Sequence, residues 1–192
     1  MPKTVQADHN EAARKRAGFF SAPKIVRRFA KDQEGVTAIE FAMLAMPFFM
    51  LLMAIVETSL LFFAGQVLES SVDEVGRKIR TGQLDQTLTE DQLRDEICES
   101  AAVLFDCDGL LIDMQVVATY DELGDAPKPE DGEIDPSDFK FEAAGPKQIV
   151  MLTVVAEWPV FTNYLQQYLS GLNNGNAVLT GITAFKTEPY SS

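Results

Sequence analysis

The sequence predicts an α+β protein in which a long apolar helix near the amino terminus leads into a smaller mixed domain. Three observations support this class. Residues 36–64 form an apolar run with almost no charge, an amphipathic helical pattern follows directly, and three later segments carry the apolar residues typical of strands. A chain of 192 residues leaves roughly 120 residues for the domain, which is enough for a modest core.

Residues 1–35 precede the apolar run and have the composition of a cytoplasmic leader. They hold eight Lys/Arg and four acidic residues, a net charge of +4, and they include His9, the one histidine of the chain. Basic residues beside a spanning helix are more often signals of membrane topology than a nucleic-acid patch. We therefore interpret this segment as a basic leader on the cytoplasmic side.

The apolar run predicts a transmembrane helix over 36–64. No charged residue occurs from Phe41 to Val56, and the run resumes after Glu57. A helix of this length would extend about 43 Å, against roughly 30 Å for the hydrocarbon core of a bilayer. It is also too long for an ordinary cleaved signal sequence. Pro47 should bend it by removing one backbone hydrogen bond; the alternative is a proline that a membrane helix simply tolerates.

The charge of the chain is divided between the two sides of this helix. Residues 69–192 hold eight basic and 23 acidic residues, a net charge of -15, within a total of -13. Basic residues remain on the cytoplasmic side of a spanning helix. The asymmetry predicts that residues 65–192 form an exported domain, and its acidity argues against a nucleic-acid partner.

The helical pattern continues beyond the membrane run. Apolar residues recur at Leu68, Val72, Val75 and Ile79, which predicts that the same helix extends into the exported domain, with Gly82 as a stop. Thr89 and Gln92 then form a capping-box pattern that opens a second helix.

Both cysteines lie in the exported part. Cys98 falls at the end of the second helix and Cys107 in the turn that follows. A separation of nine suits neither a zinc knuckle nor a thioredoxin-type pair, and an oxidising compartment favours pairing. We predict a disulfide that pins the helix to the first strand; the alternative is two buried thiols.

Three segments predict an antiparallel sheet of three or more strands. Residues 110–120 alternate, with Ile112 and Met114 on one face and Asp113 on a face expected to be wet, while 149–158 reads as a central strand and 178–186 as a third. Between the first two strands, 121–146 holds nine acidic residues and four prolines, which predicts a long exposed and partly disordered loop.

The segment 161–172 alternates aromatic and polar residues and predicts a short helix. The pattern does not decide whether its aromatic side chains are exposed or buried. A partner could bind an apolar surface formed by Phe161, Tyr164 and Tyr168, but aromatic residues at helical spacing are more often part of a core.

Residues able to carry catalysis are scarce in the exported domain. With its histidine in the leader, the domain cannot assemble a Ser-His-Asp or Cys-His site or a histidine-ligated zinc. Asp131, Asp135 and Asp138 could collect a calcium ion, yet they lack EF-hand spacing, and a solvated acidic loop is the more ordinary interpretation. We expect no catalytic residues, no metal site, no cofactor and no enzymatic activity.

The start of the apolar helix carries a recognisable pattern. Gly35 is followed at five residues by Glu40 and Phe41, just after a basic segment, and this resembles the processing site of type IV prepilins. The resemblance implies that a peptidase cuts between Gly35 and Val36. A carboxylate at the edge of the hydrocarbon needs a partner, which would be the new amino group of a neighbouring subunit. Alternatively, Glu40 merely marks the point where the helix enters lipid.

A longer block strengthens this resemblance. The run from Gly35 to Ala42, Pro47, Glu57 and the sequel from Leu68 to Arg77 are similar to the TadE-like family, whose members are minor pilins or pseudopilins of the Tad (Flp-type) pilus machinery. The end of the chain, from Phe185 to Tyr190, is also similar to the ends of such proteins.

The resemblance implies a structural role in Tad/Flp pilus assembly, with a pilin-like domain in the periplasm and the helix in the bacterial inner membrane. The implied partners are that membrane, a prepilin peptidase, pilin subunits and other Tad pilus proteins. The alternative is an uncleaved, membrane-anchored periplasmic binding or interaction protein that uses the acidic loop for recognition.

Overall fold

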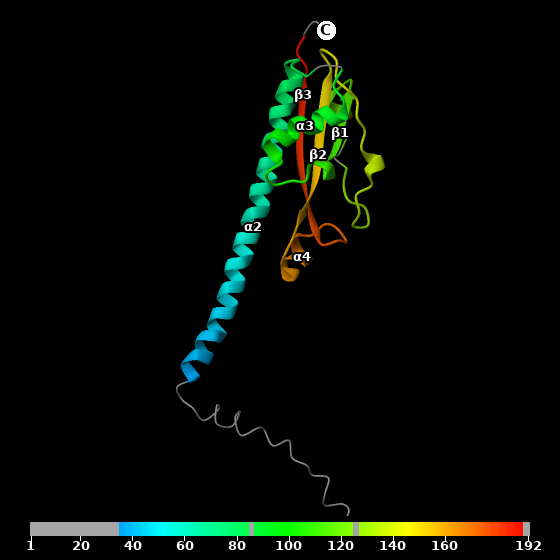
Figure 1. The fold of residues 1–192 in the computed structure, drawn as a ribbon. Coiled ribbons are helices and arrows are strands. Elements are labelled where there is room, and N and C mark those ends of the chain that lie inside the picture. The colour runs from blue at the N-terminus through cyan, green and yellow to red at the C-terminus, as the bar shows by residue number, and fades with distance from the viewer. Residues whose placement is uncertain (1–34, 85–86, 125–126, 190–192) are drawn as a thin grey trace, which may run out of the picture. The chain divides into compact units, whose positions relative to one another are not determined.

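The computed structural model describes residues 35–84, 87–124 and 127–189 (Figure 1). The expected leader lies outside these residues, except for Gly35. Two compact units follow one another along the chain, and the division falls between Met50 and Leu51. The first unit is described over 35–50, which is the beginning of a helix. The second contains the remainder of that helix and all other elements.

Helix α2 spans Val36–Arg80 and includes Pro47. The large apolar side chains from Val36 to Val56 are exposed on every side of it, which is typical of a helix that faces lipid. Among the described residues it is the one helix that is long and apolar enough to cross a membrane. The expected continuous helix, with its candidate membrane span, is confirmed.

The second half of α2 belongs to the core of the domain. Its buried apolar residues follow one helical face: Ala64, Leu68, Val72, Val75 and Ile79. The helix stops where predicted, because Gly82 adopts a left-handed conformation (φ 74°) and donates its N–H to Ile79 O at 3.1 Å. The amphipathic extension of the membrane helix is therefore confirmed.

Helix α3, Glu90–Ala101, follows after a short connection. Thr89 and Gln92 form the predicted capping box, in which each side chain accepts the backbone N–H of the other residue, at 3.3 Å for the N–H of Gln92 and 3.0 Å for that of Thr89. Leu93, Ile97 and Ala101 are buried against the core.

Three antiparallel strands form one sheet in the order β1-β2-β3 (Figure 1). They are β1 Leu111–Val117, β2 Ile149–Pro159 and β3 Asn176–Lys186. In the register, Ile112 pairs with Val154 and Met114 with Leu152, and all four belong to the core shared with α2 and α3. The central position of β2 and the three-stranded α+β architecture are as predicted.

Strand β3 approaches α2 closely at two glycines. A Cβ atom added to Gly181 would lie 2.9 Å from Val72 Cγ2 and 3.4 Å from the Cα of Glu69, and one added to Gly76 would lie 2.7 Å from Thr183 Cγ2. The helix and the strand therefore pack at a distance that only glycine allows at these positions.

The expectation of a wet face on the first strand is wrong at Asp113. This residue is fully buried, and its carboxylate accepts the backbone N–H of Lys140 at 2.8 Å. Residues 140–142 run alongside β1, where Met114 donates its N–H to Lys140 O at 2.7 Å and Met114 O accepts the N–H of Glu142 at 2.9 Å. The acidic segment is thus attached to the sheet over these residues, although most of its described part is exposed as expected.

The predicted short helix between the last two strands is α4, Asn163–Leu169. It lies at the end of the sheet where β2 stops and β3 begins (Figure 1). The interpretation of Phe161, Tyr164 and Tyr168 as core residues is wrong, because all three are mostly exposed.

Candidate functional site

The junction between Gly35 and Val36 coincides with the start of α2. Gly35 is the last residue before the α-helix, and Val36 is its first. A Cβ atom at Gly35 would meet no atom within 4 Å, and Val36 is 49% exposed. The described surroundings therefore leave this peptide bond open to an approaching protein.

Glu40 lies one helical turn beyond Val36. Residues four apart share one face of a helix, so the backbone nitrogen of Val36 and the carboxylate of Glu40 belong to the same side of α2. Glu40 is exposed, and within the described ranges its side chain has no hydrogen-bond or ion-pair partner. A carboxylate near a helix amino terminus is stabilised by the helix dipole. It also remains available to a cation from another molecule.

Glu57 makes contacts that the sequence did not reveal. Its side chain is buried, and one carboxylate oxygen accepts the backbone N–H groups of Phe161 and Thr162, the latter at 3.1 Å. The other oxygen accepts the hydroxyl of Thr162. These two residues connect β2 to α4, so Glu57 joins the anchor helix to the base of the domain.

Glu57 lies at the end of the apolar part of α2. It directly follows the charge-free apolar run that ends at Val56. A charged side chain in hydrocarbon is costly and is expected to find a partner. This rule could have singled out Glu57 in the sequence, but it could not have identified Phe161 and Thr162 as its partners. Because Phe161 and Thr162 belong to the folded domain, the domain already lies beside α2 at the position of Glu57.

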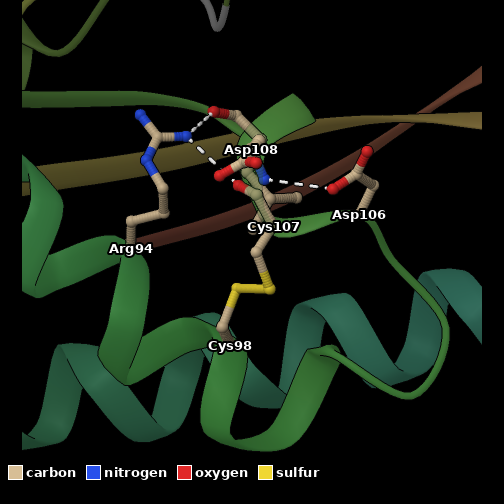
Figure 2. The surroundings of a disulfide bond; sticks show 6 residues. Arg94, Cys98, Asp106, Cys107 and Asp108 are labelled. Atoms are coloured by element: carbon tan, nitrogen blue, oxygen red, sulfur yellow. Dashed lines mark hydrogen bonds between the residues drawn. A yellow bond between two sulfur atoms is a disulfide. The ribbon is translucent and has the colours of Figure 1, made fainter.

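The predicted disulfide between Cys98 and Cys107 is present (Figure 2). Cys98 lies near the end of α3, and Cys107 begins a short 3-10 turn, Cys107–Gly109, just before β1. Arg94, one turn earlier on α3, donates from Nη1 to the carbonyl oxygens of Cys107 and Leu110. The covalent bond and the guanidinium together fix α3 to the start of the sheet.

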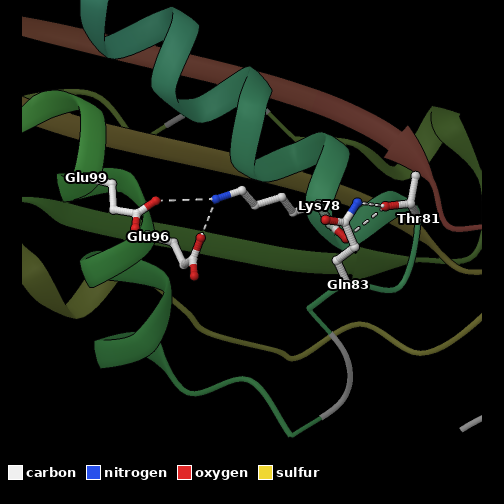
Figure 3. Close-up of polar contacts among 5 residues, drawn as sticks. All are labelled: Lys78, Thr81, Gln83, Glu96 and Glu99. Carbon is white, nitrogen blue, oxygen red and sulfur yellow. Dashed lines mark hydrogen bonds and ion pairs between the residues drawn. The ribbon is translucent and has the colours of Figure 1, made fainter.

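The carboxyl end of α2 is tied to α3 by a small charge cluster (Figure 3). The Lys78 Nζ atom lies 2.6 Å from Glu96 Oε2 and 3.6 Å from Glu99 Oε2. The hydrogen bond to Glu96 raises the pKa of Lys78 above its ordinary value. Lys78 is one of three basic residues in the last turn of α2, where they also complement the helix dipole.

No group of three or more His, Cys, Asp or Glu side chains is placed to hold a metal ion within the described parts of the chain. His9 lies outside those parts. The expectations that the protein has no metal site, no cofactor and no enzymatic activity stay predictions.

The chain was compared with known families, curated proteins and solved structures. Residues 35–77 match the family described as TadE-like protein. This confirms the resemblance seen in the sequence and suggests a component associated with the Tad pilus. The matched stretch contains Gly35, Val36, Glu40 and Glu57, whereas α3 and the sheet lie beyond it. No curated protein and no solved structure matches the chain.

Proposed function

We propose that this chain, whose residues 35–77 match the TadE-like family, is a structural component of Tad/Flp pilus assembly that acts as a minor pilin or pseudopilin after cleavage between Gly35 and Val36. One observation carries the proposal. An open glycine stands directly before the first residue of an apolar helix, and an exposed carboxylate without a partner in the described chain lies one turn inside that helix.

Cleavage would change the electrostatics of this helix start. A prepilin peptidase hydrolyses the Gly35–Val36 bond and leaves an ammonium group on Val36. Two oppositely charged groups at the same helix end can then pair between neighbouring subunits. In a poorly hydrated helix bundle, desolvation offsets much of the attraction, so the pair mainly sets the register of one subunit against the next. The role is non-enzymatic.

The charge distribution supports an inner-membrane protein with a periplasmic domain. The segment before the helix has a net charge of +4, and residues 69–192 have -15. Basic residues near a spanning helix remain in the cytoplasm. An alkaline phosphatase fusion after Ser192 should therefore be active. A stable but inactive fusion would contradict this orientation.

The decisive experiment is a pair of substitutions in cells that make the pilus. Gly35→Leu should retain the leader and abolish pilus assembly, because a bulky side chain obstructs the peptidase. The expected increase in mass is about 4 kDa for 35 residues, since 192 residues weigh 21.2 kDa. Gly124→Leu is the matched control, because Gly124 also has open space around it, and this variant should be processed normally.

The second substitution separates processing from assembly. Glu40→Gln should leave membrane insertion intact and lower pilus assembly, whereas Glu69→Gln, which changes an exposed residue farther along α2, should not. Normal assembly with Gly35→Leu would refute the prepilin interpretation. A wild-type protein that still begins at Met1 or Pro2 in piliated cells would do the same and would favour the uncleaved membrane-anchored binding protein.

A further inference from the structure

One stretch of the exported domain differs from the remainder in charge. Residues 158–185 contain no Asp, Glu, Lys or Arg, although residues 69–192 together carry a net charge of -15. The stretch covers the end of β2, helix α4 and nearly all of β3. A surface without charge inside an acidic domain is repelled less by an anionic surface than the charged remainder of the domain is, because salt screens the more distant charges.

The same stretch exposes large aromatic side chains next to the anchor helix. Phe161, Tyr164 and Tyr168 are between 65% and 74% exposed, and the two tyrosine rings lie 5.4 Å apart on one side of α4. Phe62 and Phe63 of α2 are also exposed. We call these five residues the aromatic collar.

The contacts of Glu57 set the level of this collar along α2. Phe161 and Thr162 bind Glu57, so α4 begins beside the residue that ends the charge-free run. Glu40 and Glu57, which flank the charge-free run, are 17 residues apart, about 26 Å of helix, so both carboxylates lie near the two edges of a hydrocarbon core of roughly 30 Å. Phe62 and Phe63 are then about 7 to 9 Å beyond Glu57, within or at the edge of the headgroup layer.

We propose that the aromatic collar lies in the headgroup layer of the same bilayer that α2 enters, so that the domain rests on the membrane through α4. Tyrosine favours this layer, because its hydroxyl can stay hydrated while its ring is buried, and the phenylalanine rings add apolar area that the layer can cover. The inference rests on the proposed membrane anchor. It also shortens the span expected from the sequence, because the hydrocarbon then ends near Glu57 rather than at Ala64.

A full-length protein with single tryptophan probes, reconstituted in phosphatidylcholine vesicles, tests this contact. Tyr164→Trp and Tyr168→Trp are made in a Trp158→Phe background and measured with lipids brominated at shallow or deep positions. Tyr120→Trp is the matched control. Tyr120 is exposed and follows the end of β1 that pairs with Ile149, about 33 Å along β2 from Pro159.

The expected result is quenching at 164 and 168 by shallow bromines, stronger than by deep bromines, with no quenching at 120. Adding anionic lipid or salt should change it little, because the collar carries no charge. The same probes are also made in protein that retains Trp158, and the fluorescence of the unsubstituted protein is subtracted. This second set still tests the contact if Trp158→Phe perturbs folding.

A fourth probe, Phe49→Trp, reports on the anchor itself. Quenching of Phe49→Trp by deep bromines without quenching at 164 and 168 would overturn the collar contact and leave the proposed function intact. No quenching at any probe would instead remove the membrane anchor on which both rest. Emission at 164 that shifts with the protein-to-lipid ratio and is not quenched by lipid would assign the collar to a second copy of the chain and overturn the lipid contact.

Discussion

Replacing Glu57 with alanine should detach the base of the domain from its anchor helix. The substitution removes a carboxylate that accepts three hydrogen bonds from Phe161 and Thr162. Two backbone N–H groups in a partly buried place then lose their acceptor. Replacement by glutamine is milder, because an amide can still accept from the backbone and can donate to the hydroxyl of Thr162.

The size of the effect follows from the type of bond. A hydrogen bond to a charged group contributes about 1.5 to 3 kcal/mol, and three of them with some access to water suggest a loss of about 3 to 5 kcal/mol for Glu57→Ala. Glu57→Gln should cost about 1 kcal/mol, since only the charge-assisted part is lost. For a domain of this size, each kcal/mol lowers the midpoint of thermal unfolding by about 3 to 5 °C.

Trp158, the one tryptophan of the chain, is a suitable reporter of unfolding. It lies near the end of β2, close to the Glu57 contacts in sequence, and packs edge-to-face on Phe105 with ring centroids 5.8 Å apart. The full-length protein in nanodiscs is melted while tryptophan fluorescence is followed. Glu69→Ala is the control, because Glu69 is exposed on the same helix and has no polar side-chain partner in the described ranges. Equal midpoints for the two alanine variants would refute the reasoning.

Three further predictions concern the domain. Replacing Cys98 and Cys107 with serine should lower the free energy of unfolding by about 2 to 3 kcal/mol, because the disulfide closes a short loop with a sequence separation of nine. Denaturant titrations with and without reductant measure this loss. An unchanged midpoint of the wild-type protein after reduction would contradict it. Gly181→Ala should lower the free energy of unfolding by about 1 to 3 kcal/mol, because the added methyl group overpacks against Val72. Adding Val72→Ala should restore part of this loss. Thermal unfolding of the single and double variants measures the effect, and losses that simply add would show that the two residues do not touch. Lys78→Met should destabilise the domain at neutral pH, because the raised pKa of Lys78 means that the protonated amine stabilises the fold. The difference in stability from wild type should fade as the pH rises above the unfolded-state pKa of about 10.4. Thermal unfolding at several pH values measures it, and a difference that persists at high pH would assign the effect to packing.

The sequence predicted those features whose signals lie within one or two turns of chain. The capping box of Thr89 and Gln92 and the glycine stop at Gly82 are such local patterns. The placement of Gly35, Val36 and Glu40 at the start of α2 followed from the same kind of spacing. The apolar periodicity from Leu68 to Ile79 likewise identified the buried face of α2, because that face repeats with the helix.

Contacts between distant parts of the chain were not predictable in this way. Asp113 was expected to be solvent-exposed from strand alternation, yet it is buried and accepts the backbone N–H of Lys140, 27 residues later. Glu57 could be recognised as a charge that needs a partner, but its partners are 104 and 105 residues away. Aromatic spacing in α4 suggested a core, because periodicity alone does not say whether a face meets protein, water or lipid.

The continuity of α2 has a mechanical consequence. From Glu57 to Arg80 the helix is already part of the folded domain, bound through the Glu57 carboxylate at one end and packed against β3 at Gly76 and Gly181. A force that pulls on this part of the helix is therefore carried into the sheet at once, with no flexible segment to extend first. Because the strand runs beside the helix over several turns, the load acts as shear across many contacts rather than as peeling from one end. Tension on the helix between Glu57 and Arg80 is thus shared by the whole length of β3 that it touches.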